Sequence, residues 1–233
     1  MKPVSVVIPV YNHEAFIAEA IESVLQQSYP NLQIIVVDDG STDGTKDVLE
    51  KYKGKIELIS QANAGLPAAR NAGIRWATGE FIAFLDSDDV FLPEKIEKQL
   101  RVFEENPEVG MVHTGASVVR PNETGWEVWY DYWPPTYATR EEQIDELLKW
   151  NYMVVSTVMV KRELFSQVGL FNESLRYAED YEMWLRLLTC CSIGVVPDIF
   201  IHYRWHGGNM SRQPDESILP VIREEAAKRF GRT

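Results

Sequence analysis

The chain has little cysteine, little positive charge and no long apolar run. Only two of its 233 residues are cysteine, and these two, Cys190 and Cys191, are adjacent. Neighbouring cysteines can form neither a disulfide framework nor a metal site of the usual spacing, so we expect a reducing, cytoplasmic compartment. The 23 lysines and arginines are outnumbered by 35 aspartates and glutamates, and the formal charge is −12. Because nucleic-acid binders need a basic surface, that class of partner is excluded.

No apolar stretch reaches the roughly 18 residues that a membrane span requires, so we expect none. The first apolar run is interrupted by Pro9 and Asn12, which argues against a signal peptide. Peripheral association with the inner face of a membrane stays open.

The phosphate-binding patterns GxxxxGK[ST] and GxGxxG are also absent, so we expect no P-loop. The chain is 45% hydrophobic and 25% charged, which is typical of a globular protein.

The first half of the chain alternates strand patterns with helix patterns. Strands are expected over 4–10, 32–37, 55–60, 81–85 and 110–119, and helices over 14–27, 41–52, 65–77 and 93–104. The strand segments are apolar runs, whereas the first helix repeats apolar residues at three-to-four spacing. This order with short loops predicts an α/β fold, a mostly parallel sheet with helices on both faces.

The composition changes after Pro121. Residues 122–137 are rich in tryptophan, tyrosine and proline, too irregular for a helix and too aromatic for an idle loop. Helices are expected over 140–150, 179–188 and 215–230, a strand over 154–160, and a bent strand pair over 195–205. We therefore expect one compact unit with a nucleotide-type half, 1–120, and an acceptor-type half, 121–233.

Three carboxylates follow the apolar strand segment 81–85. Asp86, Asp88 and Asp89, with Ser87 among them, would repel one another unless a positive charge lies between them. A divalent cation answers this, and Mg²⁺ or Mn²⁺ fits with phosphate as a further ligand. The alternative is an acidic turn that caps the next helix. The position after a buried strand favours the metal site.

Two other strand ends carry residues suited to a nucleotide. Asp39 follows strand 32–37 and could accept a hydrogen bond from a base or a ribose, or could serve ordinary turn chemistry. Pro9, Tyr11 and Asn12 end the first strand, and Tyr11 could stack on a base or pack at the strand end. Since ligands of open α/β sheets bind beyond the carboxyl ends of the strands, these residues are candidates for one site.

Later segments add charged groups. Arg70, within the small-residue segment 63–73, could hold an anionic nucleotide group or could be a solvated arginine on a packed helix. Glu179 and Asp180 open a helix, where a carboxylate could act as a general base or simply cap the helix. His206 could add a metal or phosphate contact, although a lone histidine is commonly a packing residue.

These motifs occur together in one order. They are PVYN at 9–12, VVDDGSTD at 36–43, NAGLPAARNAG at 63–73, GEFIAFLDSDD at 79–89 and AEDYEMWLRL at 178–187. As a set they closely resemble the inverting glycosyltransferases of family 2, and the resemblance covers about residues 3–210. It implies a GT-A fold, which is a Rossmann-like, mostly parallel sheet flanked by helices with a smaller acceptor-side part.

The resemblance also assigns roles to residues of this sequence. The implied nucleotide-binding residues are Pro9, Tyr11, Asn12, Asp39, Arg70, Ser87 and Asp88. The implied metal ligands are drawn from Asp86, Asp88, Asp89 and His206, and spacing does not settle which carboxylate touches the metal. Asp180 matches the family's catalytic base, with Glu179 beside it. Asp39 would read the uracil N–H group.

The implied reaction transfers one sugar from a nucleotide-sugar, most often UDP-linked, to an acceptor hydroxyl. It needs Mn²⁺ or Mg²⁺, inverts the anomeric centre, and serves polysaccharide, cell-envelope or glycoconjugate biosynthesis. The QxxRW signature of processive members is absent, which favours single transfer. The acceptor stays open among a sugar, a lipid-linked molecule and a protein. The aromatic segment 126–137 is either acceptor surface or a contact with a partner subunit, such as the second copy of a homodimer.

Two other functions compete with this reading. One is a catalytically silent nucleotide-sugar-binding scaffold, which the intact Asp180 disfavours. The other is a sugar nucleotidyltransferase, which usually carries a glycine-rich, basic loop near its N-terminus. The segment PVYNHE at 9–14 has neither property.

Overall fold

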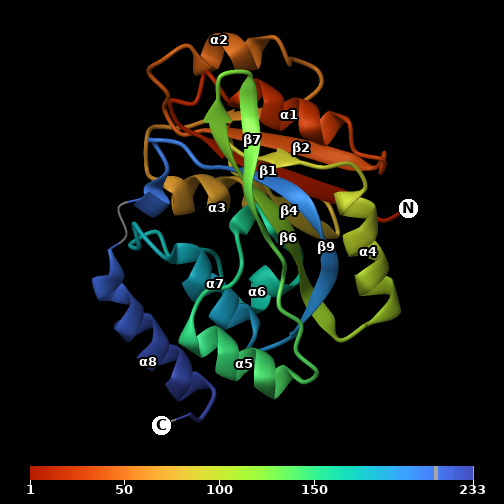
Figure 1. Ribbon diagram of the computed structural model, residues 1–233, viewed down its shortest axis with the longest axis vertical. Coiled ribbons are helices and arrows are strands. Elements are labelled where there is room, and N and C mark those ends of the chain that lie inside the picture. Colours follow the sequence, from red (N-terminus) through yellow and green to blue (C-terminus); the bar gives the residue numbers. More distant parts are fainter. Residues whose placement is uncertain (213–214, 233) are drawn as a thin grey trace.

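The computed structural model describes residues 1–212 and 215–232, which fold around one nine-stranded sheet (Figure 1). The strands are β1 Val4–Val10, β2 Leu32–Asp38, β3 Glu57–Ser60, β4 Phe81–Phe84, β5 Val90–Phe91, β6 Val109–Asn122, β7 Gly125–Tyr132, β8 Met159–Lys161 and β9 Ser192–Arg204. Their spatial order is β3-β2-β1-β4-β8-β6-β9-β5, and β7 pairs with β6 outside this path.

Helices flank this sheet. They are α1 Ile17–Leu25, α2 Thr45–Glu50, α3 Leu66–Trp76, α4 Lys95–Glu105, α5 Arg140–Lys149, α6 Leu164–Val168, α7 Glu179–Leu187 and α8 Leu219–Arg229. Short 3-10 turns lie at Val155–Thr157, Met210–Arg212 and Glu216–Ile218. None of the helices in the described ranges combines the length and the apolar character needed to cross a bilayer.

The first four strands form the parallel part of the sheet. Strand β1 lies between β2 and β4, and β3 extends the sheet beyond β2, all in parallel. Every residue of β1 is buried, because helices cover both of its faces. The later strands join through antiparallel pairs of β8 with β4 and β6, whereas β9 runs parallel to β6. The expected α/β architecture is confirmed.

Alternate residues of β1 feed two hydrophobic cores, as the period of a strand requires. Val6 and Ile8 belong to the core that α1 and α4 cover. Val7 belongs to the opposite core, which contains residues of α3, α5 and α7, with Trp184 fully buried in it. Helix α3 approaches β1 closely, since a Cβ atom built on Gly73 would lie 2.4 Å from Cγ1 of Val7.

Several expected elements differ in detail. The aromatic segment after Asn122 is a strand, because β7 pairs with β6 in a hairpin. The side chain of Asn122 accepts a hydrogen bond from the Thr124 amide, which fixes the turn. Instead of a bent strand pair over 195–205, residues 195–204 are part of one continuous strand, β9. Helix α4 begins after Glu94, whose φ of 67° keeps it outside the helix, and not at Pro93.

Candidate functional site

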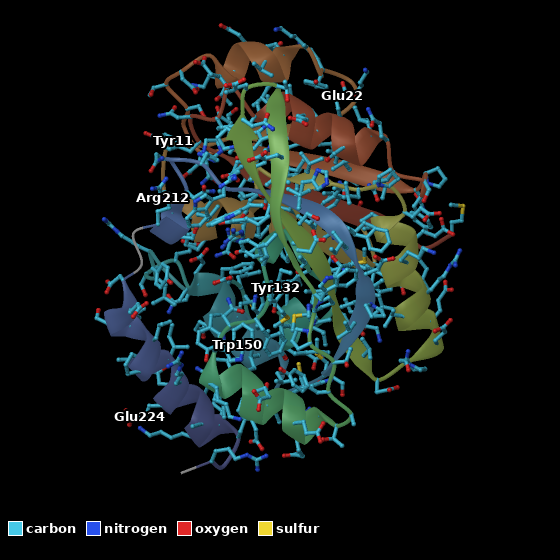
Figure 2. All side chains as sticks on the ribbon, viewed as in Figure 1. Tyr11, Glu22, Tyr132, Trp150, Arg212 and Glu224 are labelled. Carbon is cyan, nitrogen blue, oxygen red and sulfur yellow. The ribbon has the colours of Figure 1, made fainter. Side chains whose placement is uncertain are left out.

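Three parallel strands, β1, β2 and β4, deliver polar loops to one edge of the sheet. Asn12, just after β1, has a left-handed φ of 53°. Its backbone N–H donates to Ser41 Oγ at 3.0 Å, and its Oδ1 accepts from the Thr42 amide at 2.8 Å. Asn12 therefore ties the loop after β1 to the loop after β2. Neighbouring Tyr11 leaves 45% of its surface exposed at this edge (Figure 2), so its ring is accessible to a ligand.

Asp39 lies buried in a cradle of donors. Its Oδ1 accepts from Gln61 Nε2 at 2.7 Å and from the Ala64 amide at 2.9 Å. Its Oδ2 accepts from the Gly65 amide at 2.8 Å. Because Oδ2 receives only this one bond, it retains capacity for a further donor, such as an N–H group of a ligand. Next to it, Asp38 has a buried Oδ2 atom with no hydrogen-bond partner in the described residues.

Arg70 of α3 joins two acidic segments. Its side chain is 1% exposed, with Nη1 at 2.5 Å from Glu179 Oε1 and Nη2 at 2.7 Å from Asp86 Oδ1. Burial alone would lower the pKa of Arg70, but the charges of Asp86 and Glu179 raise it, so the guanidinium is charged. Arg70 thus fixes the loop after β4 against the first turn of α7.

The carboxylates after β4 have separate environments. Asp89 is fully buried, its Oδ2 accepts from Ser156 Oγ at 2.5 Å, and its Oδ1 accepts from the Arg204 amide at 3.1 Å. Burial, then the charges of Asp88 and Asp86, raise the pKa of Asp89 well above its usual value. Across 1–212 and 215–232, no three His, Cys, Asp or Glu side chains are grouped to hold a metal ion.

Asp88 and His206 form the pair best placed to bind a cation. His206 Nε2 lies 3.0 Å from Asp88 Oδ2, and His206 Nδ1 accepts from the Gly208 amide at 3.1 Å. Because Nδ1 accepts this bond, Nε2 is the ring nitrogen that faces Asp88, and it would give up its proton when a cation binds there. Burial raises the pKa of Asp88, but the hydrogen bond from His206 and the charges of His13 and His206 outweigh it, so the pKa is lowered.

A carboxylate and an imidazole are chemically suited to a divalent cation that takes its remaining ligands from phosphates and water. The Asp88–His206 pair is 13–14% exposed, so it can be reached from solvent. His13 lies beside it, with Nδ1 at 2.7 Å from Ser87 Oγ. The sequence reasoning did not single out His13, although it directly follows the PVYN motif.

Asp180 differs from Glu179 although both open α7. Glu179 is buried against Arg70, whereas Asp180 is only partly buried. Asp180 Oδ2 accepts from Asn151 Nδ2 at 3.0 Å. Burial, followed by the charge of Glu179, raises the pKa of Asp180 to about 7, against the opposing effects of Arg70, Tyr181 and Asn151. A carboxylate with this pKa is suited to accept a proton near neutral pH. Asn151 was also missed by the sequence reasoning, because its partner lies far along the chain.

The structure therefore brings most of the candidate residues to one edge of the sheet, as three linked groups. Asn12 and Asp39 organise the loops after β1 and β2. Asp88, Ser87 and His206 form the second group, and the carboxylates of α7 form the third. Pro9 lies buried within β1, where it pairs with Val37.

Comparisons with known proteins identify the family of this chain. The family model described as "Glycosyl transferase family 2" matches residues 5–169. The putative teichuronic acid biosynthesis glycosyltransferase TuaG of Bacillus subtilis is 36% identical over 189 residues, covering 79% of this chain and 71% of TuaG. The uncharacterised glycosyltransferase RT0329 of Rickettsia typhi is 33% identical over 208 residues, or 87% of this chain, which spans 64% of that protein.

The solved structure of S. aureus TarS shows the same fold. S. aureus TarS, residues 1–349 in complex with UDP-GlcNAc, superposes with a TM-score of 0.76 at 24% identity. The match covers 98% of this chain and 66% of the TarS chain. The expected GT-A fold, with its curled, mostly parallel sheet flanked by helices, is thereby confirmed.

Proposed function

The chain belongs to glycosyl transferase family 2, and from this we propose that it transfers a single sugar from a UDP-sugar to an acceptor hydroxyl. The observation that carries the proposal is that a candidate general base and a candidate site for a cation and diphosphate lie at the same edge of the sheet. Asp180 has a pKa raised to about 7, and Asp88 lies 3.0 Å from His206 at the place where we propose that a cation binds. TuaG is named as a putative glycosyltransferase of teichuronic acid biosynthesis, and we propose a cell-envelope or related glycan product here.

The loops after β1 and β2 are proposed to bind the nucleotide. Asp39 is held by three donors and keeps an acceptor site on Oδ2, which suits the N–H group of uracil. The exposed ring of Tyr11 could stack on the base. The fold neighbour TarS was solved with UDP-GlcNAc, which makes a UDP-sugar the first donor to test.

A divalent cation, Mn²⁺ or Mg²⁺, would be held by Asp88 and His206 together with the diphosphate. When bound, it would neutralise the negative charge that develops on the departing diphosphate.

Asp86 accepts a hydrogen bond from Arg70, and Asp89 accepts one from Ser156, so their proposed part is to support the loop that carries Asp88. Ser87, bonded to His13, lies on the same loop.

Asp180 is the proposed base. It accepts the proton of the acceptor hydroxyl while that oxygen bonds to the anomeric carbon and the carbon–phosphate oxygen bond breaks. Attack from the face opposite the leaving diphosphate inverts the anomeric centre. Arg70 neutralises Glu179, so Asp180 is the α7 carboxylate that remains available for the proton. We propose that 1–120 supplies the donor side and 121–233 the acceptor side, with His206 completing the donor side.

The test compares wild type with Asp180→Asn, using UDP-GlcNAc and Mn²⁺ and measuring UDP release and UDP binding. We expect UDP release to fall by about 10²–10⁴-fold while UDP affinity stays unchanged. Asp145→Asn, an exposed carboxylate on α5, serves as the control and should retain full activity. Equal turnover by Asp180→Asn and wild type would refute the base assignment. UDP binding without turnover in wild type would favour the silent scaffold.

A further inference from the structure

An aromatic groove lies next to Asp180, and no step described above uses it. It encloses about 250 Å³ between β6, β7, β9 and the segment after α5. Its main walls are Tyr130, Tyr132, Trp150, Asn151, Tyr203 and Trp205. Figure 2 shows Tyr132 and Trp150 close to each other in the lower half of the molecule, between β7 and α5.

Asn151 connects this groove to the proposed base. It lines the groove, and its Nδ2 donates to Asp180 Oδ2 at 3.0 Å. Its Oδ1 accepts from the Met153 amide at 3.1 Å, which fixes the orientation of the side-chain amide. Another lining residue, Trp205, directly precedes the proposed cation ligand His206 in the chain. The groove lining therefore contains a residue bonded to the proposed base and the chain neighbour of a proposed cation ligand.

The lining combines flat apolar surface with polar atoms at its edge. Trp150 and Tyr130 are 44% and 51% exposed, so their rings face solvent and can be covered by a ligand. Tyr203 and Ser211 share a hydrogen bond of 2.8 Å between their hydroxyls. Tyr152 also lines the groove, is 2% exposed, and has a hydroxyl with no hydrogen-bond partner in the described residues.

This chemistry suits a sugar ring better than an acyl chain. A pyranose has a face of C–H groups that packs on aromatic rings and hydroxyls at its rim that need donors and acceptors. An acyl chain would leave the hydroxyl of Tyr152 without a hydrogen-bond partner among the described residues. The volume is just below the roughly 300–1,000 Å³ of pockets for drug-sized ligands, which fits one ring and not several.

We propose that this groove binds a pyranose ring of the acceptor, with Trp150 and Tyr130 against the ring and Asn151 directing a ring hydroxyl to Asp180. This assignment rests on the proposed function, since it supplies that reaction with its acceptor. It narrows the acceptor class to molecules that present a sugar ring, whether that ring is free or belongs to a larger carrier.

Saturation-transfer NMR on the whole chain tests the proposal without any donor. The ring probes are methyl β-D-glucopyranoside, methyl α-D-mannopyranoside and methyl N-acetyl-β-D-glucosaminide, with ribitol as the acyclic comparison. Octyl β-D-glucopyranoside separates ring protons from chain protons. We expect saturation of ring C–H protons for at least one pyranoside, reduced about three- to tenfold in Trp150→Ala and Tyr130→Ala. Trp133→Ala, 58% exposed and outside the groove lining, should match wild type.

Three results would overturn the proposal: no pyranoside saturates, ribitol or the octyl chain saturates as strongly as the ring, or Trp150→Ala and Tyr130→Ala both match wild type. UDP release from UDP-GlcNAc, measured on the same preparation, separates the two claims. Release without ring saturation overturns only the groove assignment, whereas ring saturation without release overturns only the proposed function.

Discussion

The ion pairs of Arg70 give the sharpest stability prediction. Arg70→Met keeps most of the side-chain length but removes both charged hydrogen bonds, at 2.5 Å to Glu179 and 2.7 Å to Asp86. Breaking a buried pair by deleting one partner typically costs about 3–5 kcal/mol, because the remaining charge stays buried. Glu179 is 8% exposed and carries this cost, whereas Asp86 at 26% exposure keeps some contact with water. We therefore expect Arg70→Met to lower the free energy of unfolding by about 3–5 kcal/mol.

Urea denaturation, followed by the fluorescence of the seven tryptophans, among them the buried Trp184, measures this change. Arg75→Met is the matched control on the same helix, since its pair with Glu173 is 3.5 Å long and exposed. Such surface pairs contribute about 0–1 kcal/mol. Adding Glu179→Gln to Arg70→Met should recover part of the loss, because it removes the stranded charge. An Arg70→Met variant no less stable than Arg75→Met would show that these contacts do not hold α3, α7 and the loop after β4 together.

Three further predictions concern pH, metal and packing. Transfer should rise with pH and level off above about 7, since Asp180 acts deprotonated, and a flat pH profile of kcat/KM would contradict this. His206→Ala should weaken the binding of Mn²⁺ in the presence of UDP by at least about tenfold, as measured by calorimetry. The binding of UDP without metal should stay unchanged. An unchanged Mn²⁺ affinity would show that His206 is not part of the cation site. Gly73→Ala should lower stability by about 1–3 kcal/mol in urea, because its Cβ would contact Val7, and a gain in stability would show that α3 can move away from β1.

Local sequence pattern predicts the strands of the parallel half well, and with them the place of the site. The apolar runs that become β1, β2 and β4 are continuous because both faces of these strands are covered. Parallel strands end at one edge, so Asp39 and Asp88 could be expected there from the sequence alone. The roles assigned to these residues come from the family resemblance and remain predictions.

The remaining features depend on contacts between distant segments, which local periodicity does not encode. Arg70 meets Glu179 across 109 positions, and His206 meets Asp88 across 118. Strand β7 was missed because Trp129 interrupts the alternation of its apolar positions with Glu127 and Asp131, and because the prolines that follow make the segment look irregular. The bond of Asn151 to Asp180 likewise appears only when α7 packs near the end of α5.

The central claim is that the sheet edge where β1, β2 and β4 end binds a nucleoside diphosphate together with a cation. A thermal-shift panel tests this claim most directly. UDP, GDP, dTDP and CMP are each added with and without Mn²⁺. Ligand at 100 times its Kd stabilises a protein by about 2.7 kcal/mol, which is roughly 5–10 °C for a chain of this size. We predict the largest shift for UDP with Mn²⁺ and its reduction in Asp88→Asn. No shift with millimolar UDP and Mn²⁺ would contradict the account.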